Sequence, residues 1–340
     1  MFSASRPGVA IVAIGRNEGE RLHGCLRAAL AAAATVVYAD SGSSDGSAAW
    51  ARSLGCTVHE LDPARTFSAA RARNEGFARL MEIAPETKFV QFLDGDSEID
   101  PGWLDAALAA LEARPELGIV RGHLTEMHPE ASVFNRLCNL EWQQTPGEIA
   151  ACGGIFLVRA EAFRAAGGFR PEVIAAEDDE FCVRVRAEGW KIAMLDAPMA
   201  RHDAAMTRLS QWWKRARRAG HAYAQVAALH GGNHERYFVH DRRKIWIWGL
   251  ALPVGALLLA PFTRGLSLVV LAGLYALQFL YIRRGVRNRG WRSSDAWLYA
   301  FFTVISRFPG AAGLMEYHLR SLMGREPRII EHKSEYKRSL

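Results

Sequence analysis

The sequence predicts an α/β fold, a Rossmann-like sheet flanked by helices, followed by a C-terminal membrane helical region. Short apolar runs alternate with helical patterns through residue 124, as in sheets wound from βαβ units. Polar turns follow the apolar runs, and two uncharged apolar segments follow residue 244. With 340 residues, 50% of them hydrophobic and 23% charged, the chain has a globular composition and room for two domains.

The expected elements follow in order from this patterning. Continuous apolar runs such as Val9–Ile14 and Thr35–Ala39 are typical of buried strands. Asp45 is a candidate helix cap, and Pro101 suits the first turn of a helix. The expected strands are residues 9–14, 35–39, 89–93, 118–124, 155–158 and 191–195. The expected helices are residues 22–30, 45–52, 68–81, 101–113, 132–142 and 181–190.

Asp94 and Asp96 follow the apolar run that begins at Phe89. Ligands in open α/β sheets bind outside the carboxyl ends of the strands, so these carboxylates are expected at a ligand site. Carboxylate oxygens suit Mg²⁺ or Mn²⁺, and Gly95 between them allows backbone or a phosphate to approach closely. The alternative is an ordinary polar turn, since Asp-Gly is a common turn dipeptide.

Further polar clusters follow other strands. Asp40 ends the second run and either accepts hydrogen bonds from a nucleoside or serves turn chemistry alone. Arg71, Arg73 and Asn74 are expected on or near one helix face, where arginine forks match phosphate oxygens; a solvated face is the alternative. Glu177 opens a run of four carboxylates, which favours a helix N-terminus but also raises the proton affinity of at least one member. Such a carboxylate is a candidate general base.

Charge and cysteine usage restrict the class of protein. The net charge is +6, but Arg201 onward holds 23 of the 42 Lys+Arg and only 8 of the 36 Asp+Glu, so an acidic half precedes a basic half. The five cysteines have no metal-ligand spacing, which favours the reducing cytosol. The start MFSASRPG shows no signal peptide, and no nucleic-acid-binding motif is visible.

Four motifs together resemble the family-2 glycosyltransferases, inverting enzymes of the GT-A fold. They occur in the family's order between about Gly8 and Gly220: VAIVAIGRNE, ADSGSSDGS, LDGDSEID and EDDEFCVRVRAEGW. The resemblance implies that Glu18 and Asp40 hold the nucleoside of a nucleoside-diphosphate sugar, with a UDP-sugar as the default. It implies that Arg73 and Asp94 lie at the diphosphate.

The resemblance also implies a mixed sheet and a metal-dependent reaction. Asp94, Asp96 and His202 would hold Mn²⁺ or Mg²⁺, and Asp178 would deprotonate the acceptor hydroxyl. The segment between residues 132 and 158 looks like an acceptor-side insertion. The residues expected on the acceptor side are Trp142, Gly153, Gly154 and Glu177.

One departure bears on the product. Processive polysaccharide synthases of the family carry Q-x-x-R-W, whereas Gln211 to Arg215 reads Q-W-W-K-R. We therefore expect one sugar to be added per acceptor. The alternatives are a polyprenyl-phosphate sugar synthase, a non-catalytic membrane scaffold that binds sugar nucleotides or glycans, and a soluble nucleotidyltransferase. The last is disfavoured because no Gly-rich phosphate loop with a lysine lies near the start.

The basic half is expected to attach to a membrane. Leu209–Leu229 combines tryptophan with lysine and arginine, which suits an interfacial helix. Ile245–Ala260 and Leu266–Ile282 are uncharged and near the short end of the roughly 17–25 residues of a spanning helix. Basic residues flank this hairpin on both sides, so the positive-inside rule places the flanks in the cytoplasm. A buried helical pair or a re-entrant hairpin are alternatives.

Four regions are therefore expected. A GT-A catalytic domain covers residues 1–228, a linker 229–244, a membrane hairpin 245–282 and a basic amphipathic region 283–340. Within the last region, Trp297–Met323 is expected to form helices broken at Pro309 and Gly310. The expected protein is an inner-membrane glycosyltransferase facing the cytoplasm, whose acceptor is a glycan or a lipid-linked glycan in cell-envelope or exopolysaccharide synthesis.

Overall fold

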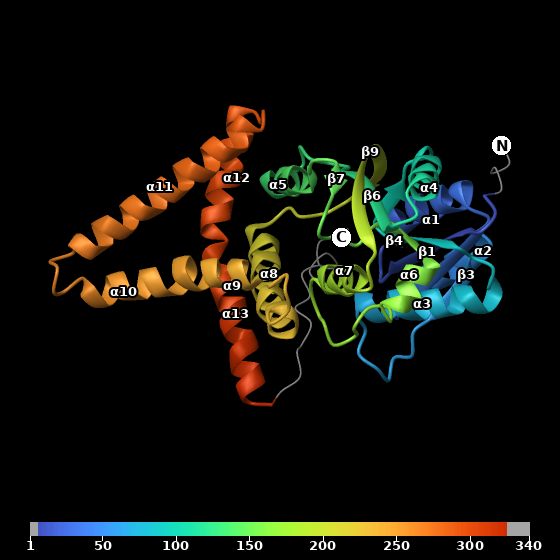
Figure 1. Cartoon of the computed structure of the whole chain (residues 1–340), viewed down its shortest axis with the longest axis horizontal. Coiled ribbons are helices and arrows are strands. Elements are labelled where there is room, and N and C mark those ends of the chain that lie inside the picture. The colour runs from blue at the N-terminus through green and yellow to red at the C-terminus, as the bar shows by residue number, and fades with distance from the viewer. Residues whose placement is uncertain (1–5, 325–340) are drawn as a thin grey trace. The chain divides into compact units, whose positions relative to one another are not determined.

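The computed structural model describes residues 6–324 (Figure 1). Contacts divide them into two compact units. The first contains the residues up to His128 together with Glu141–Ala205, and the second contains Pro129–Leu140 and the residues from Met206 onward. The division falls at Ala205, earlier than the expected boundary at 228, because helix α8 (Leu209–His230) packs on α13 (Arg307–Leu322).

The first unit is built on a single mixed sheet. Its described strands follow the order β3-β2-β1-β4-β8-β6-β9-β5, and β7 pairs with β9. β1 pairs in parallel with β2 and β4, whereas β8 is antiparallel to both β4 and β6. The strands are β1 Val9–Gly15, β2 Thr35–Asp40, β3 Thr57–Glu60, β4 Phe89–Asp94, β5 Ser97–Ile99, β6 Leu117–Glu126, β7 Gly147–Glu148, β8 Phe156–Arg159 and β9 Lys191–His202.

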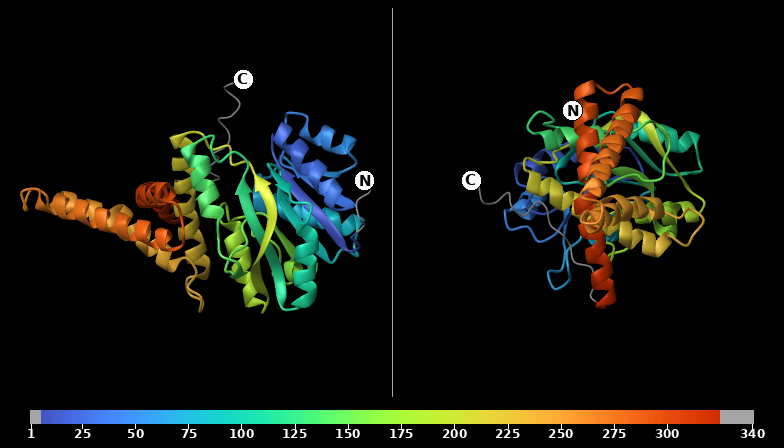
Figure 2. Two further views of the ribbon diagram at one scale, coloured as in Figure 1. Left: turned by 90° about the horizontal axis from the view of Figure 1, so that it is seen from above. Right: turned by 90° about the vertical axis from the view of Figure 1, so that its left-hand side faces the viewer.

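Helices cover both faces of this sheet (Figure 2). Side chains alternate along β1, so that Ile11 packs with Leu22 and Trp103 on one face and Val12 packs with Phe77 on the other. The helices of the unit are α1 Glu20–Ala32, α2 Ser47–Ser53, α3 Ala69–Ile83, α4 Trp103–Ala113, α6 Ala160–Ala165 and α7 Glu177–Ala187. The expected mixed α/β sheet flanked by helices is confirmed.

The short elements differ from the expectation. β3, β5, β7 and α6 were not expected, and α7 begins at Glu177, so that the acidic run forms its first turn instead of preceding it. The three missed strands have two to four residues, too few for a hydrophobic period to be visible. β5 matters for the site, because its pairing with the end of β9 brings the segment of Asp96 next to His202.

The second unit is helical within the described residues. It contains α5 (Val133–Trp142) up to Leu140, and then α8, α9 Val239–Trp246, the π-helical turn η1 Ile247–Ala251, α10 Leu252–Leu259, α11 Leu266–Asn288, α12 Ser293–Ile305 and α13. α8 and α13 approach closely at Gly220 and Gly313, where a methyl group would collide with backbone of the facing helix. α9 begins at Val239, inside the expected linker.

Two stretches of the second unit are long and apolar enough to be candidate membrane spans, by length and composition. They are Leu266–Asn288, whose most apolar window is 0% buried, and Ser293–Leu322, whose window is 44% buried. The expected segment 245–260 instead combines the end of α9, the π-helical turn and α10. Leu258, Phe262 and Val269 on the hairpin are 68%, 85% and 67% exposed, which is the surface that a bilayer would cover.

The expected break at Pro309 and Gly310 was wrong. The chain turns at Ser306 and α13 begins at Arg307, which places Pro309 in the first turn of that helix. Proline is tolerated there because the first N–H groups of a helix have no intrahelical partner. Of the expected region 283–340, residues 325–340 lie outside the described residues.

Candidate functional site

Three potential metal ligands meet at one edge of the sheet. Asp94 ends β4, Asp96 follows it, and His202 ends β9. One ligand atom from each lies within 4.8 Å of the others. The pairing of β5 with β9 brings them together, because Ser97 is opposite His202 and the Asp203 N–H donates to the Asp96 carbonyl at 2.9 Å. His202 Nε2 lies 3.0 Å from Asp96 Oδ1.

Gly95 between the two aspartates is required by a close backbone approach. Its N–H donates to the Ile14 carbonyl at 2.7 Å, which ties the turn to the end of β1. A Cβ there would lie 3.1 Å from that carbonyl oxygen and 3.2 Å from Glu18 Cγ. Glu18 itself pairs with Arg21 at 2.7 Å. The turn therefore places the two aspartates beside the β1–α1 turn that carries Glu18.

Arg73 links the metal-ligand cluster to α7. Its guanidinium, 2% exposed, contacts Asp94 Oδ1 through Nη2 and Glu177 Oε1 through Nη1, both at 2.9 Å. Burial alone would lower the pKa of Arg73, but the carboxylates of Asp94, Glu177 and Asp178 together raise it above the ordinary value. The guanidinium is therefore held charged in a fixed position between two acidic elements.

Asp178 has the electrostatic character of a general base. Burial, followed by the neighbouring Glu177 carboxylate, raises the pKa of Asp178 from 3.8 to about 6, against the opposing effect of Arg73. A carboxyl group with a pKa of about 6 is ionised at neutral pH and more basic than an ordinary aspartate. It lies at the N-terminus of α7, preceded by Ala176 in the left-handed region at φ 54°.

Asp40 is built into the turn that follows β2. It is 1% exposed, accepts a hydrogen bond from the Tyr38 hydroxyl at 2.9 Å and accepts another from the Ser43 N–H at 2.8 Å. Asp45 lies one residue before Gly46, the N-cap of α2, rather than at the expected cap position, and it accepts from the Ser47 N–H at 3.1 Å and from the Gly19 N–H. Both aspartates thus fix the two turns that border the sheet edge.

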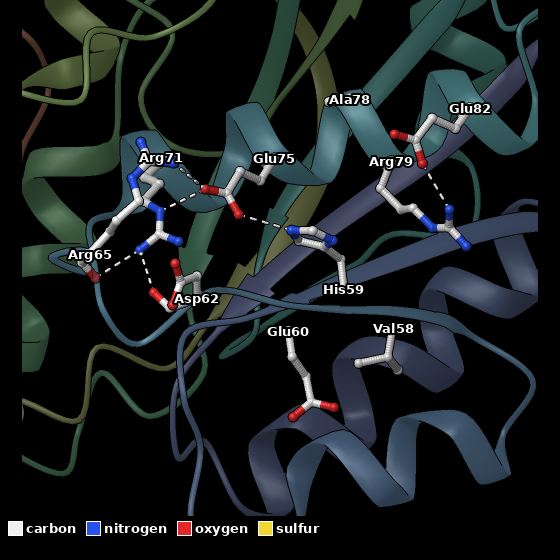
Figure 3. Close-up of a pocket in the computed structure, with 10 residues that line it drawn as sticks. All are labelled: Val58, His59, Glu60, Asp62, Arg65, Arg71, Glu75, Ala78, Arg79 and Glu82. Atoms are coloured by element: carbon white, nitrogen blue, oxygen red, sulfur yellow. Dashed lines mark hydrogen bonds and ion pairs between the residues drawn. The ribbon is translucent and has the colours of Figure 1, made fainter.

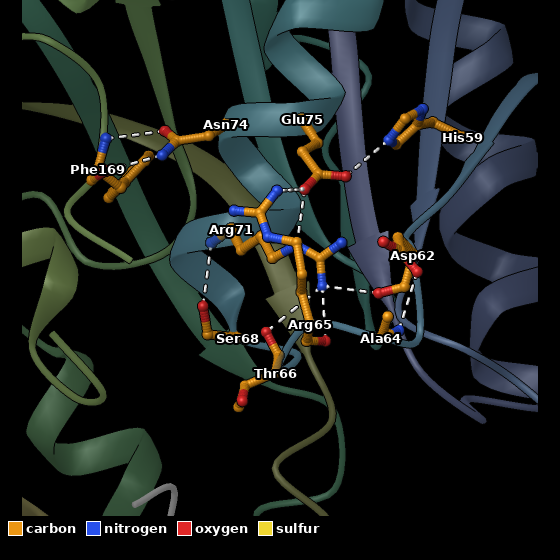
Figure 4. Close-up of polar contacts among 10 residues, drawn as sticks. All are labelled: His59, Asp62, Ala64, Arg65, Thr66, Ser68, Arg71, Asn74, Glu75 and Phe169. Carbon is orange, nitrogen blue, oxygen red and sulfur yellow. Dashed lines mark hydrogen bonds and ion pairs between the residues drawn. The ribbon is translucent and has the colours of Figure 1, made fainter. Parts of the chain in front are cut away.

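Arg71 and Arg73 point to different partners, which corrects the expectation that they share a face. Residues two apart on a helix lie on opposite sides. Arg71 donates to Glu75 Oε1 at 2.6 Å and to the carbonyls of Asp62 and Arg65 at 3.0 and 2.8 Å (Figure 4). It therefore holds the loop before α3. The side-chain amide of Asn74 donates through Nδ2 to the Phe169 carbonyl and accepts through Oδ1 from the Phe169 N–H.

A pocket of about 520 Å³ lies between β3 and α3 (Figure 3). Its charged side chains contact one another, since Arg71 pairs with Glu75 at 2.6 Å and Arg79 with Glu82 at 2.8 Å. Of the residues singled out from the sequence, Arg71 lines it, and its guanidinium is already bonded to Glu75 and to loop carbonyls. We assign no ligand to this pocket.

The residues expected on the acceptor side lie around the same carboxylates. Trp142 stacks on His202 with ring centroids 4.9 Å apart. A Cβ on Gly154 would lie 2.7 Å from Arg73 Nη2 and 3.0 Å from Asp94 Oδ2, and a Cβ on Gly153 would lie 4.0 Å from Asp178 Oδ2. Gly154 thus borders the metal-ligand cluster, where a side chain would crowd Arg73 and Asp94, and Gly153 borders Asp178 in a left-handed conformation at φ +71°.

Arg121 was missed by the sequence reasoning. It lies on β6, is 5% exposed, and its Nη1 is 3.6 Å from the Cβ position of Gly153. An arginine within the apolar strand run from Gly118 to Leu124 is unusual, and this could have marked Arg121 as a candidate site residue.

Comparison with known proteins identifies the family. The family described as "Glycosyltransferase like family 2" matches residues 7–222. The chain belongs to this family. The pre-mycofactocin glycosyltransferase of Mycobacterium tuberculosis (strain ATCC 25618 / H37Rv) is 26% identical over 187 residues, which cover 52% of this chain and 38% of that protein. The chain therefore matches well under half the length of this curated relative.

Solved structures show the same fold. The mannosyltransferase PcManGT from Pyrobaculum calidifontis, in complex with GDP-Man and Mn²⁺, aligns with a TM-score of 0.62 at 18% identity, covering 95% of this chain and 89% of that chain. Residues 1–349 of S. aureus TarS align with a TM-score of 0.51 at 14% identity, covering 94% and 93%. The predicted family and the GT-A fold are confirmed.

Proposed function

We propose that the protein transfers one sugar from a nucleoside diphosphate to a hydroxyl group of an acceptor, with inversion at the anomeric carbon and with Mn²⁺ or Mg²⁺ as cofactor. The observation that carries this proposal is that the candidate metal ligands and the candidate base lie close together. The cluster of Asp94, Asp96 and His202 is connected through Arg73 and Glu177 to Asp178.

The donor set fits the expected metal. Two carboxylates and one imidazole suit Mn²⁺, and carboxylates with water suit Mg²⁺. Such an ion, when bound, neutralises the diphosphate that leaves from the sugar. Asp94 and Asp96 would hold the ion with His202, and Arg73 adds a fixed positive charge beside Asp94. Glu18 and the turn held by Asp40 are the proposed contacts for the nucleoside.

Asp178 is the proposed catalytic base. It would accept the proton of the acceptor hydroxyl while the acceptor oxygen forms a bond to the anomeric carbon. The bond between that carbon and the diphosphate oxygen breaks, and the leaving group departs as the nucleoside diphosphate. One in-line displacement inverts the anomeric centre, so that no carboxylate nucleophile is needed. Trp142, Gly153, Gly154 and Glu177 would border the acceptor.

The second unit supports attachment to a membrane. α11 is long and apolar enough to span one, and large apolar side chains on the hairpin are exposed. Arg242–Lys244 precede the hairpin and Arg283–Arg287 follow it, whereas Arg264 is the single charge in the turn. By the positive-inside rule we place the flanks and the catalytic unit in the cytoplasm, at the inner membrane. A membrane-attached transferase suits a lipid-linked glycan of the cell envelope or an exopolysaccharide as acceptor.

The comparisons agree with a sugar-nucleotide donor and a metal, since PcManGT was solved with GDP-Man and Mn²⁺. A UDP-sugar is the default donor for this chain. Single addition remains a prediction from Q-W-W-K-R; in the structure, Gln211 Oε1 accepts from the N–H groups of Thr207 and Arg208 at the start of α8.

The test uses the full-length protein in detergent micelles with a panel of UDP- and GDP-sugars. Release of nucleoside diphosphate is measured with Mn²⁺, with Mg²⁺ and with EDTA. We expect metal-dependent release from at least one donor and a product carrying one added sugar. Donor binding without release across the panel would favour a scaffold, and a ladder of long products would contradict single addition.

Variants separate the hydroxyl acceptor from a polyprenyl phosphate. Asp178→Asn should nearly abolish transfer to a hydroxyl, because a general base contributes about 10²- to 10⁴-fold. The matched control is Asp179→Asn on the same helical turn. If Asp178→Asn retains most of the activity, the acceptor is a phosphate, which needs little base catalysis.

A further inference from the structure

Arg121 is a buried guanidinium that the protein leaves largely unused. It comes from β6, within the sheet, and only 5% of it is exposed. Its Nε is 3.4 Å from the Gly122 carbonyl. Its two terminal amino groups make neither a hydrogen bond nor an ion pair with any of the described residues. Buried arginines are otherwise paired, because an uncompensated charge in the interior is costly.

Other arginines of the same unit show the contrast. Arg73 contacts two carboxylates, and Arg71 contacts Glu75 and loop carbonyls. Burial lowers the pKa of Arg121, and the nearby Asp178 carboxylate offsets this only in part, whereas the carboxylates around Arg73 raise the pKa of that residue. Arg121 therefore has donors to offer and little compensation from the protein.

The surroundings of Arg121 belong to the reaction site. Its Nη1 lies 3.6 Å from the Cβ position of Gly153, and Asp178 Oδ2 lies 4.0 Å from the same point. The Arg121 guanidinium and the Asp178 carboxylate therefore both border Gly153. Gly153 has φ +71°, a conformation that keeps this position without a side chain. The thiol of Cys152 is also near, and its burial raises its pKa, so it stays neutral and provides no counter-charge.

We propose that Arg121 binds an anionic group, a carboxylate or a phosphate, that the acceptor carries next to its attacking hydroxyl. This inference rests on the proposed function, because it takes Asp178 as the base that receives the hydroxyl proton. Arginine presents paired donors that match the oxygens of both anions. These two contacts orient the acceptor, with its hydroxyl toward Asp178 and its anionic group toward Arg121. Arg121 is then a specificity residue that selects charged acceptors.

The test measures binding and stability in full-length protein in detergent micelles. Three matched probes are used: octyl β-glucoside, octyl β-glucuronide and octyl β-glucoside 6-phosphate. Each is titrated in the presence of Mn²⁺ and UDP or GDP, and the unfolding temperature is followed. We expect at least one anionic probe to bind about tenfold or more tightly than the neutral one. The glucuronide and the phosphate distinguish the two sources of the anion.

Arg121→Met is the decisive variant, and the exposed Arg79→Gln is its charge control. Arg121→Met should abolish the preference for the anionic probe, whereas Arg79→Gln should preserve it. Removing a buried charge that lacks a partner should also leave the unfolding temperature equal or higher. A loss of several degrees would mean a structural role and overturn the proposal. So would a wild type that binds neither anion more tightly than the neutral probe.

Failure of the proposed function would give another result. Mn²⁺ with UDP or GDP would then not raise the unfolding temperature, even before any acceptor probe is added. If the nucleotide and metal bind equally to wild type and Arg121→Met but the anion preference is missing, only the assignment of Arg121 fails.

Discussion

Replacing Asp178 by asparagine should abolish transfer and at the same time stabilise the protein. The pKa of Asp178 is raised from 3.8 to about 6, primarily by burial and then by Glu177. Ionisation of this carboxyl therefore opposes folding. Asparagine keeps the shape and an acceptor oxygen but has no charge to bury.

The size and the pH window follow from the two pKa values. Below 3.8 the carboxyl is protonated in both the folded and unfolded states, so Asp178 costs nothing there. As pH rises, the unfolded state loses its proton first, and the cost is complete once pH exceeds the folded value of about 6. At 1.36 kcal/mol for each pKa unit, the full cost is roughly 3 kcal/mol. Asp178→Asn should recover about that much at pH 8 and almost nothing at pH 3.8.

The assay is thermal unfolding of the metal-free and nucleotide-free protein between pH 4 and pH 8, alongside transfer activity. For a unit of this size, 3 kcal/mol corresponds to a rise of about 6–12 °C. Asp179→Asn serves as the control for the loss of one carboxylate from the same turn. A variant that is less stable than wild type at pH 8, or whose activity falls less than tenfold, would refute the assignment of Asp178 as a buried base.

Other predictions follow from close contacts. Gly154→Ala should raise the KM for the donor about tenfold by displacing the ion pair of Arg73 with Asp94, whereas Gly232→Ala, with no atom within 4 Å of its Cβ, should not. Tyr38→Phe should lower the free energy of unfolding by about 1–3 kcal/mol, since it removes the buried hydrogen bond to Asp40; chemical denaturation measures this. Gly313→Ala should unfold the second unit at lower temperature because the methyl group meets α8 backbone, while Gly285→Ala, which meets nothing, should be neutral or stabilising.

The parts of the fold with long apolar runs were predictable. Val9–Ile14 and the run from Phe89 had to be buried strands, and their parallel pairing puts Ile14 beside Asp94. Acidic residues that follow such strands were therefore bound to gather at one edge. His202 could be placed there only by family resemblance, because its position depends on the pairing of β9 with the three-residue strand β5.

The rest depended on tertiary contacts that local patterns do not encode. The helical pattern did not show whether Arg71 or Arg73 contacts the site. The ion pairs of Arg73 with Asp94 and Glu177 identify it as the arginine that does. The turn at Ser306 precedes Pro309 because proline suits a first helical turn as well as it breaks a helix. Arg121 was missed because an arginine in an apolar run has no visible partner in sequence, and only the three-dimensional structure shows that its one hydrogen bond goes from Nε to the Gly122 carbonyl among the described residues.

The central claim is that one divalent cation is held by Asp94, Asp96 and His202 where it can meet a nucleoside diphosphate. Electron paramagnetic resonance of Mn²⁺, titrated into the full-length protein with UDP or GDP, measures this directly. We predict one bound ion per chain in the presence of a nucleotide, with an affinity about tenfold or more lower in Asp96→Asn and in His202→Ala. Binding that is independent of nucleotide and unchanged in both variants would contradict the account.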